Sequence, residues 1–285
     1  MTASLPRVRA ADLQRRLEQI VGERSPSSSP RRLALVEDYI EREFKSFGLE
    51  VESDPFLHSG RRYRNIVARG CNAPGAPLII LGAHFDSVPG SPGADDNASG
   101  VAVLLEGARI LSGLRLKHPV VYCAFNLEEL NMIGSTHFAK RLKSHGLNVA
   151  AMVSLEMLGY TDSRPGSQKY PAGLGWFYPE RGDFIGIIGN WRSASLLKSF
   201  AGAMRQVPAL PVETLTVLGN GFLVPQVRLS DHAPFWDLGY PALLLTDTAF
   251  MRNPHYHTSS DTIETLDLEF MSKVCQGVVN GVLSL

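Results

Sequence analysis

LGAHFDS at residues 81–87 and GADDNASG at residues 93–100 are the two stretches around which the chain is organised. An apolar run before the first stretch is typical of a buried strand, and apolar residues at helical spacing follow the second. This pattern places His84 and Asp86 at the carboxyl end of a strand and the paired aspartates in the loop that opens a helix. In open α/β sheets, ligands bind outside such strand ends.

The side chains expected at this edge favour a metal site. Without a cation, several carboxylates crowded beside an imidazole repel one another, and their removal from water is costly. A bound divalent ion such as zinc offsets both effects. Further candidate ligands, most of which lie at or just after an expected strand end, are Glu128, Glu129, Glu156, Asp231, His232, His255 and His257. The clustering of these residues is stronger evidence for a metal site than any single one of them.

The composition excludes several classes of protein. The chain has 285 residues with 28 acidic and 28 basic side chains, so no bulk charge attracts nucleic acid or an anionic membrane. Three distant cysteines indicate neither a disulfide framework nor a cysteine metal site. Without a recognisable secretory signal or an apolar run of about 20 residues, we expect a cytoplasmic protein with no membrane contact.

Alternating strand and helix patterns predict an α/β fold with a mixed, mostly parallel central sheet covered by helices on both faces. We expect one domain, 1–285, in which N-terminal helices at about 8–48 pack on a catalytic core at about 49–285. Strands are predicted at 49–56, 63–69, 77–81, 119–125, 149–157, 184–188, 213–218 and 242–246. Helices are predicted at 13–21, 30–47, 98–111, 136–144, 194–204, 230–236 and after Asp267.

Six motifs in order resemble those of the co-catalytic di-zinc exopeptidases of clan MH. This family includes bacterial leucyl aminopeptidases, glutamate carboxypeptidase II and glutaminyl cyclase, and the chain is most similar to the bacterial aminopeptidases. The resemblance covers about residue 65 to the C-terminus, and it implies the three-layer sandwich of zinc exopeptidases. The motifs are HFDS at 84–87, GADDNASG at 93–100, EE at 128–129 followed by GS at 134–135, LEM at 155–157, SDH at 230–232 and HYHT at 255–258.

The resemblance implies two zinc ions, about 3.5 Å apart, that hold a hydroxide between them. His84 and Glu156 correspond to the terminal ligands of one ion, and Glu129 and His257 to those of the other. Asp96 corresponds to the carboxylate that bridges them. Cobalt or manganese can replace zinc in such sites.

The same resemblance assigns roles around the metals. Glu128 corresponds to the general base, and Asp86 to the carboxylate that orients His84; Asp231 could act in the same way on His257, or could cap a helix. No tyrosine that would polarise the carbonyl group stands before Ser230. We therefore expect Arg228 to supply that contact, or to bind a substrate carboxylate.

Four residues are weaker candidates for the substrate pocket. Trp176 and Tyr178 lie in a long loop rich in Gly and Pro; they either line an apolar pocket or pack against the protein surface. Asp183 either binds a substrate ammonium group or ends a strand. His255 either contacts the site or packs in its loop.

We predict a metal-dependent exopeptidase that removes N-terminal residues from peptide or aminoacyl substrates. A glutamate, Glu156, stands where many of the aminopeptidases have an aspartate, so the type of exopeptidase stays open. The alternatives are a glutaminyl cyclase with one zinc ion and a carboxypeptidase of the same fold. A third alternative is a binding protein without activity, which the complete set of expected ligands argues against. The oligomeric state stays open.

Overall fold

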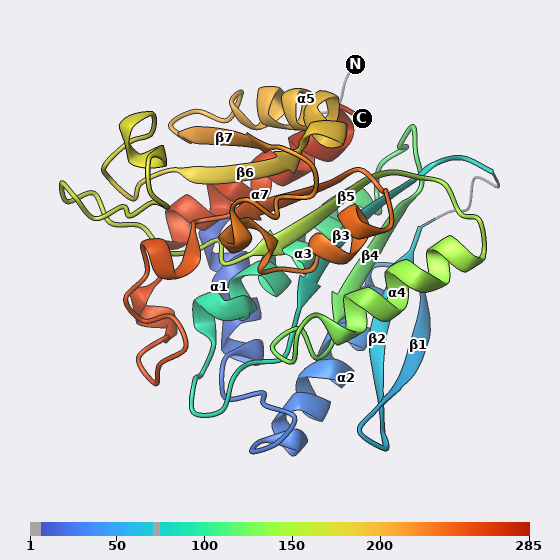
Figure 1. Cartoon of the computed structure of the whole chain (residues 1–285). Helices are drawn as coiled ribbons and strands as arrows, with labels where there is room; N and C mark the ends of the chain where they lie inside the picture. Colours follow the sequence, from blue (N-terminus) through green and yellow to red (C-terminus); the bar gives the residue numbers. More distant parts are fainter. Residues whose placement is uncertain (1–6, 71–74) are drawn as a thin grey trace.

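The computed structural model describes residues 7–70 and 75–285, within which a single sheet of eight strands forms the centre (Figure 1). The order across the sheet is β1-β2-β4-β3-β5-β8-β6-β7. The bounds are β1 Glu50–His58, β2 Arg61–Arg69, β3 Leu78–His84, β4 Val120–Phe125, β5 Val149–Glu156, β6 Ile185–Asn190, β7 Val212–Val217 and β8 Ala242–Thr246. Neighbouring strands run parallel in four of the seven pairs, including all three pairs at the centre.

Helices cover both faces of this sheet, which confirms the predicted fold class. Phe138 of α4 and Phe235 of α6 pack in the core of one face. The remaining helices supply side chains to the larger core on the other face. The bounds are α1 Ala10–Ile20, α2 Pro30–Ser46, α3 Gly100–Leu111, α4 Ile133–Ser144, α5 Ala194–Met204, α6 Ala233–Asp237 and α7 Leu268–Leu283.

The direction of the strands determines which edge of the sheet can hold a site. β4, β3, β5 and β8 are parallel neighbours, so their carboxyl ends meet at one edge. β6 runs antiparallel to β8, and β7 runs parallel to β6. The amino ends of β6 and β7 therefore lie at this same edge. The edge therefore carries the carboxyl ends of four parallel strands beside the amino ends of β6 and β7. The loops that follow β3, β4, β5 and β8 all lie there.

The N-terminal helices belong to the same core as the sheet. Buried side chains of α1 and α2, such as Leu17 and Ile40, lie in one apolar cluster with Val278 of α7. We keep the one-domain organisation as a proposal that this shared cluster supports. No helix in the described parts of the chain is both long and apolar enough to cross a membrane. Cys123 and Cys275 are buried and free, whereas Cys71 lies outside the described residues.

Candidate metal centre

Two groups of potential metal ligands lie at the edge where the parallel strands end. His84 is the last residue of β3 and Glu156 is the last residue of β5. Asp96 lies in a short helical turn, η1 (Ala94–Ser99), which opens α3. Glu129 follows β4, and His257 lies in the loop after β8. The structure therefore brings together all five side chains that the sequence predicts as ligands.

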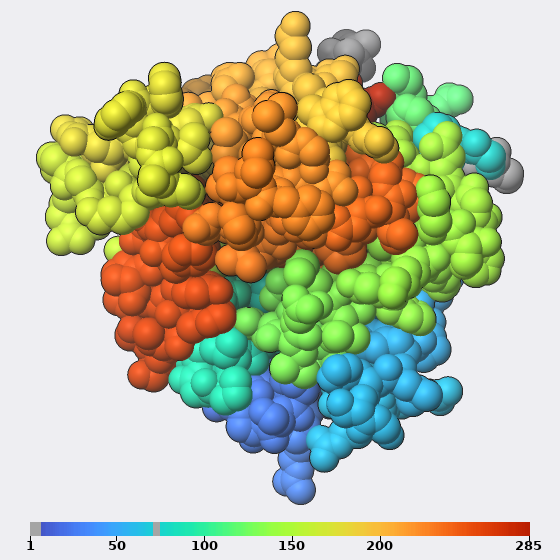
Figure 2. Space-filling model, viewed as in Figure 1, coloured from blue at the N-terminus to red at the C-terminus, as the bar shows by residue number. Residues whose placement is uncertain are grey.

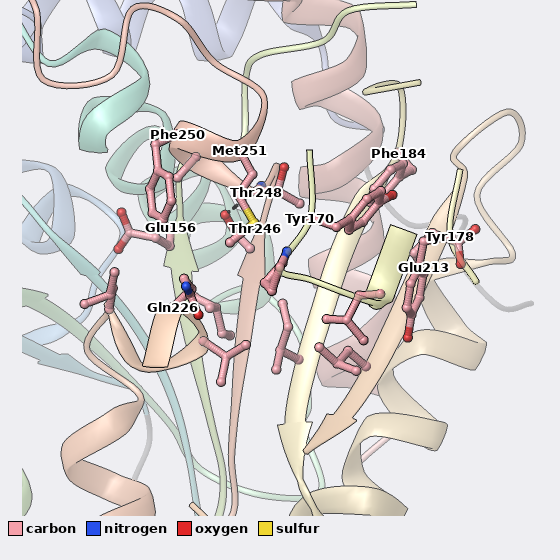
Figure 3. Close-up of a pocket in the computed structure, with 18 of the residues that line it drawn as sticks. Glu156, Tyr170, Tyr178, Phe184, Glu213, Gln226, Thr246, Thr248, Phe250 and Met251 are labelled. Carbon is pink, nitrogen blue, oxygen red and sulfur yellow. Dashed lines mark hydrogen bonds between the residues drawn. The ribbon is translucent and has the colours of Figure 1, made fainter. Parts of the chain in front are cut away.

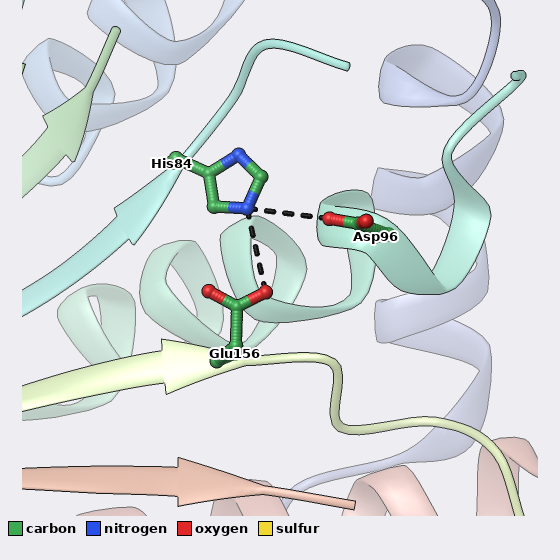
Figure 4. A group of neighbouring side chains, drawn as sticks. All are labelled: His84, Asp96 and Glu156. Carbon is green, nitrogen blue, oxygen red and sulfur yellow. Dashed lines mark hydrogen bonds and ion pairs between the residues drawn. The ribbon is translucent and has the colours of Figure 1, made fainter. Parts of the chain in front are cut away.

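The first group surrounds the Nε2 atom of His84. This nitrogen lies 3.3 Å from Oδ1 of Asp96 and 3.4 Å from Oε1 of Glu156, as Figure 4 shows. All three residues are buried. The imidazole faces both carboxylates with the same atom, which is the arrangement needed to share one cation.

The second group surrounds the Nε2 atom of His257. It lies 3.0 Å from Oδ2 of Asp96 and 3.2 Å from Oε2 of Glu129. Asp96 thus directs one oxygen to each group, which suits a carboxylate that bridges two cations. The ring of Tyr256 stacks on His257 with 3.7 Å between the ring centroids, and this contact fixes the plane of the imidazole.

Glu128 lies beside the first group without belonging to either. Its Oε2 atom is 3.8 Å from Nε2 of His84, and 13% of its side chain is exposed. Burial raises the pKa of Glu128 well above its ordinary value; the His84 charge opposes this shift and the Glu156 charge adds to it. A partly accessible carboxyl group at this position suits proton transfer to and from a substrate.

The electrostatics of both groups indicate that a cation belongs between them. Burial raises the pKa of Glu129 to about 7, and the neighbouring Asp96 charge adds to the shift. Burial alone would lower the pKa of His84, but the carboxylates of Glu156 and Glu128 raise it well above its usual value. The buried Oε1 atom of Glu129 has no hydrogen-bond partner among the described residues. Without a cation these buried groups hold protons or lack a partner, and their nitrogen and carboxylate donors are the ligand types that zinc binds.

Asp86 connects the two strands that supply the site. Its Oδ1 and Oδ2 atoms accept hydrogen bonds from the backbone N–H groups of Glu128 at 3.0 Å and Glu129 at 3.2 Å. Nδ1 of His84 lies 3.6 Å from the Asp86 carboxylate and is closer, at 3.2 Å, to its backbone carbonyl oxygen. Asp86 therefore positions the glutamate pair with its side chain and the imidazole with its backbone.

Two more residues position ligands in a way that the sequence did not indicate. The carboxylate of Asp261 accepts hydrogen bonds from the backbone N–H groups of Asp95 at 2.9 Å and Asp96 at 3.1 Å. The hydroxyl of Ser230 donates to Oε2 of Glu156 at 2.8 Å. Both contacts join residues more than 70 positions apart, so no local pattern in the sequence announces them.

A buried arginine ties the N-terminal helices to the site. The guanidinium of Arg24 is fully buried and donates to the carbonyl oxygens of Phe85, Pro92 and Gly93 at 2.7–2.9 Å. Burial lowers the pKa of Arg24 to about 10, while the Asp96 charge opposes the shift. Arg24 thereby fixes both ends of the loop between the two motifs.

We expect Arg24→Met to lower the free energy of unfolding by about 3 kcal/mol or more, because it leaves several buried carbonyl oxygens without a donor. The loop that holds His84 and Asp96 should loosen, and zinc affinity should fall with it. Thermal unfolding and zinc titration measure both effects. Arg31→Met, at an exposed position of α2, is the control. Unchanged zinc affinity in Arg24→Met would contradict the positioning role.

The structure does not bring Asp231 or Arg228 to their expected partners. The charges that act on the buried Asp231 carboxyl are His84, Glu156 and Asp86, rather than His257. Burial raises the pKa of Asp231 to about 7. The guanidinium of Arg228 donates to Asp237 and to the carbonyl of Asn220, both at 2.7 Å, and lies over the ring of Phe222. Its donors point toward the end of α6, so a role in carbonyl binding stays a prediction.

An apolar pocket opens beside the metal centre (Figure 3). Its walls include Glu156 and Tyr256 at the metal end, and side chains from β6, β7, β8 and the long loop after β5. Tyr178 lines this pocket as expected. In the space-filling view the segments after β4, β7 and β8 meet around a depression on this face (Figure 2).

The other three pocket candidates lie outside its lining. Trp176 is 90% exposed. Nδ1 of His255 lies 2.8 Å from the hydroxyl of Ser260, and Asp183 contributes its charge to Arg252. Their expected roles stay predictions.

The sequence of the chain is similar to that of known proteins. Residues 65–282 match peptidase family M28. The Escherichia coli (strain K12) protein YfbL, described as uncharacterised, is 39% identical over 85% of this chain and 77% of its own length. Aminopeptidase YwaD of Bacillus subtilis (strain 168) is 29% identical over 67% of this chain and 37% of its own length. The chain spans between 37% and 55% of the curated aminopeptidases it matches.

Solved structures share the fold. The LapA aminopeptidase of Legionella pneumophila superposes with a TM-score of 0.77 at 21% identity, covering 97% of this chain and 72% of LapA. A glutaminyl cyclase of Porphyromonas gingivalis superposes with a TM-score of 0.68 at 22% identity, covering 96% of this chain and 95% of the cyclase. At such identities the likeness establishes the fold alone.

Proposed function

Because the chain belongs to peptidase family M28, which confirms the resemblance carried by its motifs, we propose that it is a zinc-dependent aminopeptidase acting on peptides. The observation that carries this proposal is the pair of ligand groups that share Asp96. Names of relatives such as YwaD and LapA agree with it. The cytoplasmic location stays a prediction.

The two ligand groups support a site for two zinc ions. His84 and Glu156 would hold the first ion, Glu129 and His257 would hold the second, and Asp96 would offer one oxygen to each. When bound, such ions lower the pKa of a water molecule and polarise a substrate carbonyl oxygen. Three carboxylates offset most of the charge of two divalent ions, and the imidazoles complete the ligand sets.

Glu128 moves the proton in this proposal. Its carboxylate accepts a proton from the water that attacks the peptide carbonyl and passes it to the leaving amine. Asp86 holds the backbone of Glu128, so the base keeps its position relative to His84. The buried neighbours of Glu128 keep bulk water away from this transfer.

Each of the three alternatives would need a different arrangement. A glutaminyl cyclase with one zinc ion does not need a second ligand group, whereas Glu129 and His257 form one here. A binding protein without activity does not need Glu128 beside the ligands. A carboxypeptidase would need a cation for the substrate carboxylate, and Arg228 is already engaged by Asp237.

We expect the protein to hydrolyse leucyl and lysyl p-nitroanilides, to lose at least about 90% of this activity after chelation, and to recover it with added zinc. The reason is that removal of the ions leaves no group to polarise the carbonyl. Nα-acetylated substrates should not be cleaved. A glutaminyl dipeptide, followed by mass spectrometry, serves as the control for the cyclase reaction. Cleavage of acetylated substrates, or loss of ammonia from the glutaminyl peptide instead of hydrolysis, would refute the proposal.

A further inference from the structure

A single row of residues leads from the metal centre to a second carboxylate. Across the sheet, Glu156 of β5 is paired with Thr246 of β8, Thr246 with Gly186 of β6, and Gly186 with Glu213 of β7. Three strand spacings place the Cα atoms of Glu156 and Glu213 roughly 14 Å apart. Both side chains line the same pocket and lie toward its two ends (Figure 3).

Among the described residues, Glu213 has no partner for its charge. Its half-buried carboxylate makes no hydrogen bond or ion pair with any side chain of residues 7–70 and 75–285. Arg252, a cation of the neighbouring loop, donates instead to Gln168 and to the carbonyl oxygens of Tyr160 and Phe184. A carboxylate without a partner in an otherwise apolar pocket can form a charge-assisted hydrogen bond with a cation of the ligand.

Two tyrosines stand beside this carboxylate. The rings of Tyr170 and Tyr178 are stacked with 5.8 Å between their centroids, and both line the pocket. Their hydroxyls donate elsewhere, to the carbonyl oxygens of Pro179 at 2.6 Å and Thr214 at 2.9 Å. Burial raises the pKa of Tyr170 to about 12, and the Glu213 charge contributes after that of Arg252, which opposes it. Because the hydroxyls are engaged, any contact of these tyrosines with a cation would be made by their rings.

Distance decides which cation of a substrate reaches Glu213. The α-amine of an N-terminal residue is two bonds from the carbonyl carbon under attack, so it stays at the metal end. The terminal nitrogen of an extended lysine side chain lies about 7–8 Å from its own carbonyl carbon, given bond lengths of about 1.5 Å. Since Glu156 and Glu213 both reach into the pocket, this length suits the remaining gap. The apolar walls between them suit the aliphatic stem.

We propose that this pocket selects peptides whose N-terminal residue is lysine or arginine, with Glu213 as the residue that pairs with the side-chain cation. The proposal rests on the aminopeptidase function proposed above and names its substrate class. Tyr170 and Tyr178 flank the cation, and apolar side chains such as Ile188 and Leu244 contact the stem.

The test compares substrates of similar length that differ in charge. For the wild-type protein we expect kcat/KM to be at least about tenfold higher for lysyl p-nitroanilide than for its Nε-acetyl-lysyl and norleucyl counterparts, as a charge-assisted pair predicts. Glu213→Gln should remove this preference and leave norleucyl hydrolysis within about twofold. Glu180→Gln, at an exposed position of the same loop, should keep it. Norleucyl hydrolysis without a lysyl preference in the wild type would overturn the proposal while the aminopeptidase function stands.

A binding measurement separates the two proposals. Calorimetry with zinc-loaded protein should give at least about tenfold tighter binding of lysinamide than of norleucinamide, and equal binding in Glu213→Gln. If no anilide is hydrolysed, the aminopeptidase function is refuted, and this ratio alone decides the role of Glu213. Equal binding of the two amides by the wild-type protein would overturn that role.

Discussion

Glu128→Gln is expected to lower kcat by about a hundredfold to ten-thousandfold, while the protein keeps its full metal content. The side chain lies beside the first ligand group at 3.8 Å from Nε2 of His84, yet it belongs to neither group. Glutamine has the same shape but accepts no proton at neutral pH, so the substitution removes proton transfer alone. Initial rates with an aminoacyl p-nitroanilide and elemental analysis of dialysed protein measure the two quantities.

The adjacent glutamate is the matched control for this substitution. Glu129 belongs to the second group, where its Oε2 atom lies 3.2 Å from Nε2 of His257. Glu129→Gln should therefore lower metal content as well as activity, because an amide oxygen is a weaker ligand than a carboxylate. Loss of metal from Glu128→Gln would show that Glu128 is a ligand. A nearly normal kcat in that variant would exclude it as the base.

The order of the elements could be predicted because it depends on local patterns. The strand at 242–246 and the helix at 194–204 follow from short apolar periods bounded by turn residues, and the structure has them at the same bounds. His84 and Glu156 end parallel strands, and the carboxyl ends of such strands meet at one edge. The resemblance of the motifs to those of the zinc exopeptidases implied the other three ligands.

Contacts between distant segments could not be predicted in the same way. Arg24 reaches the loop after β3 from the end of α1, and Asp261 reaches η1 from the loop after β8. Both depend on how helices and loops pack, which no sequence period encodes. Arg228 is a related case: its place near a motif predicts a substrate contact, whereas its ion pair with Asp237 depends on packing that the sequence does not show. No sequence pattern singles out Glu213 as a substrate contact, because only the register of the sheet places it in one row with Glu156.

Asp96→Ala is expected to remove both zinc ions and to lower kcat/KM by at least about a thousandfold. Its two oxygens face the two imidazoles, Oδ1 toward His84 at 3.3 Å and Oδ2 toward His257 at 3.0 Å. No other described side chain belongs to both ligand groups. Removal of this carboxylate therefore takes one ligand from each ion and leaves the two cations without the charge that separates them.

His257→Ala is the matched comparison for the zinc content of Asp96→Ala. It removes a ligand from the second group only, so the first group of His84, Asp96 and Glu156 stays complete. We expect about one zinc ion per chain in His257→Ala after dialysis, and fewer in Asp96→Ala. Far-ultraviolet circular dichroism checks that both variants keep their fold, which is expected because the backbone N–H of Asp96, rather than its side chain, binds Asp261. Equal zinc content in the two variants would mean that Asp96 does not bridge two ions, and the two-metal proposal would then fail.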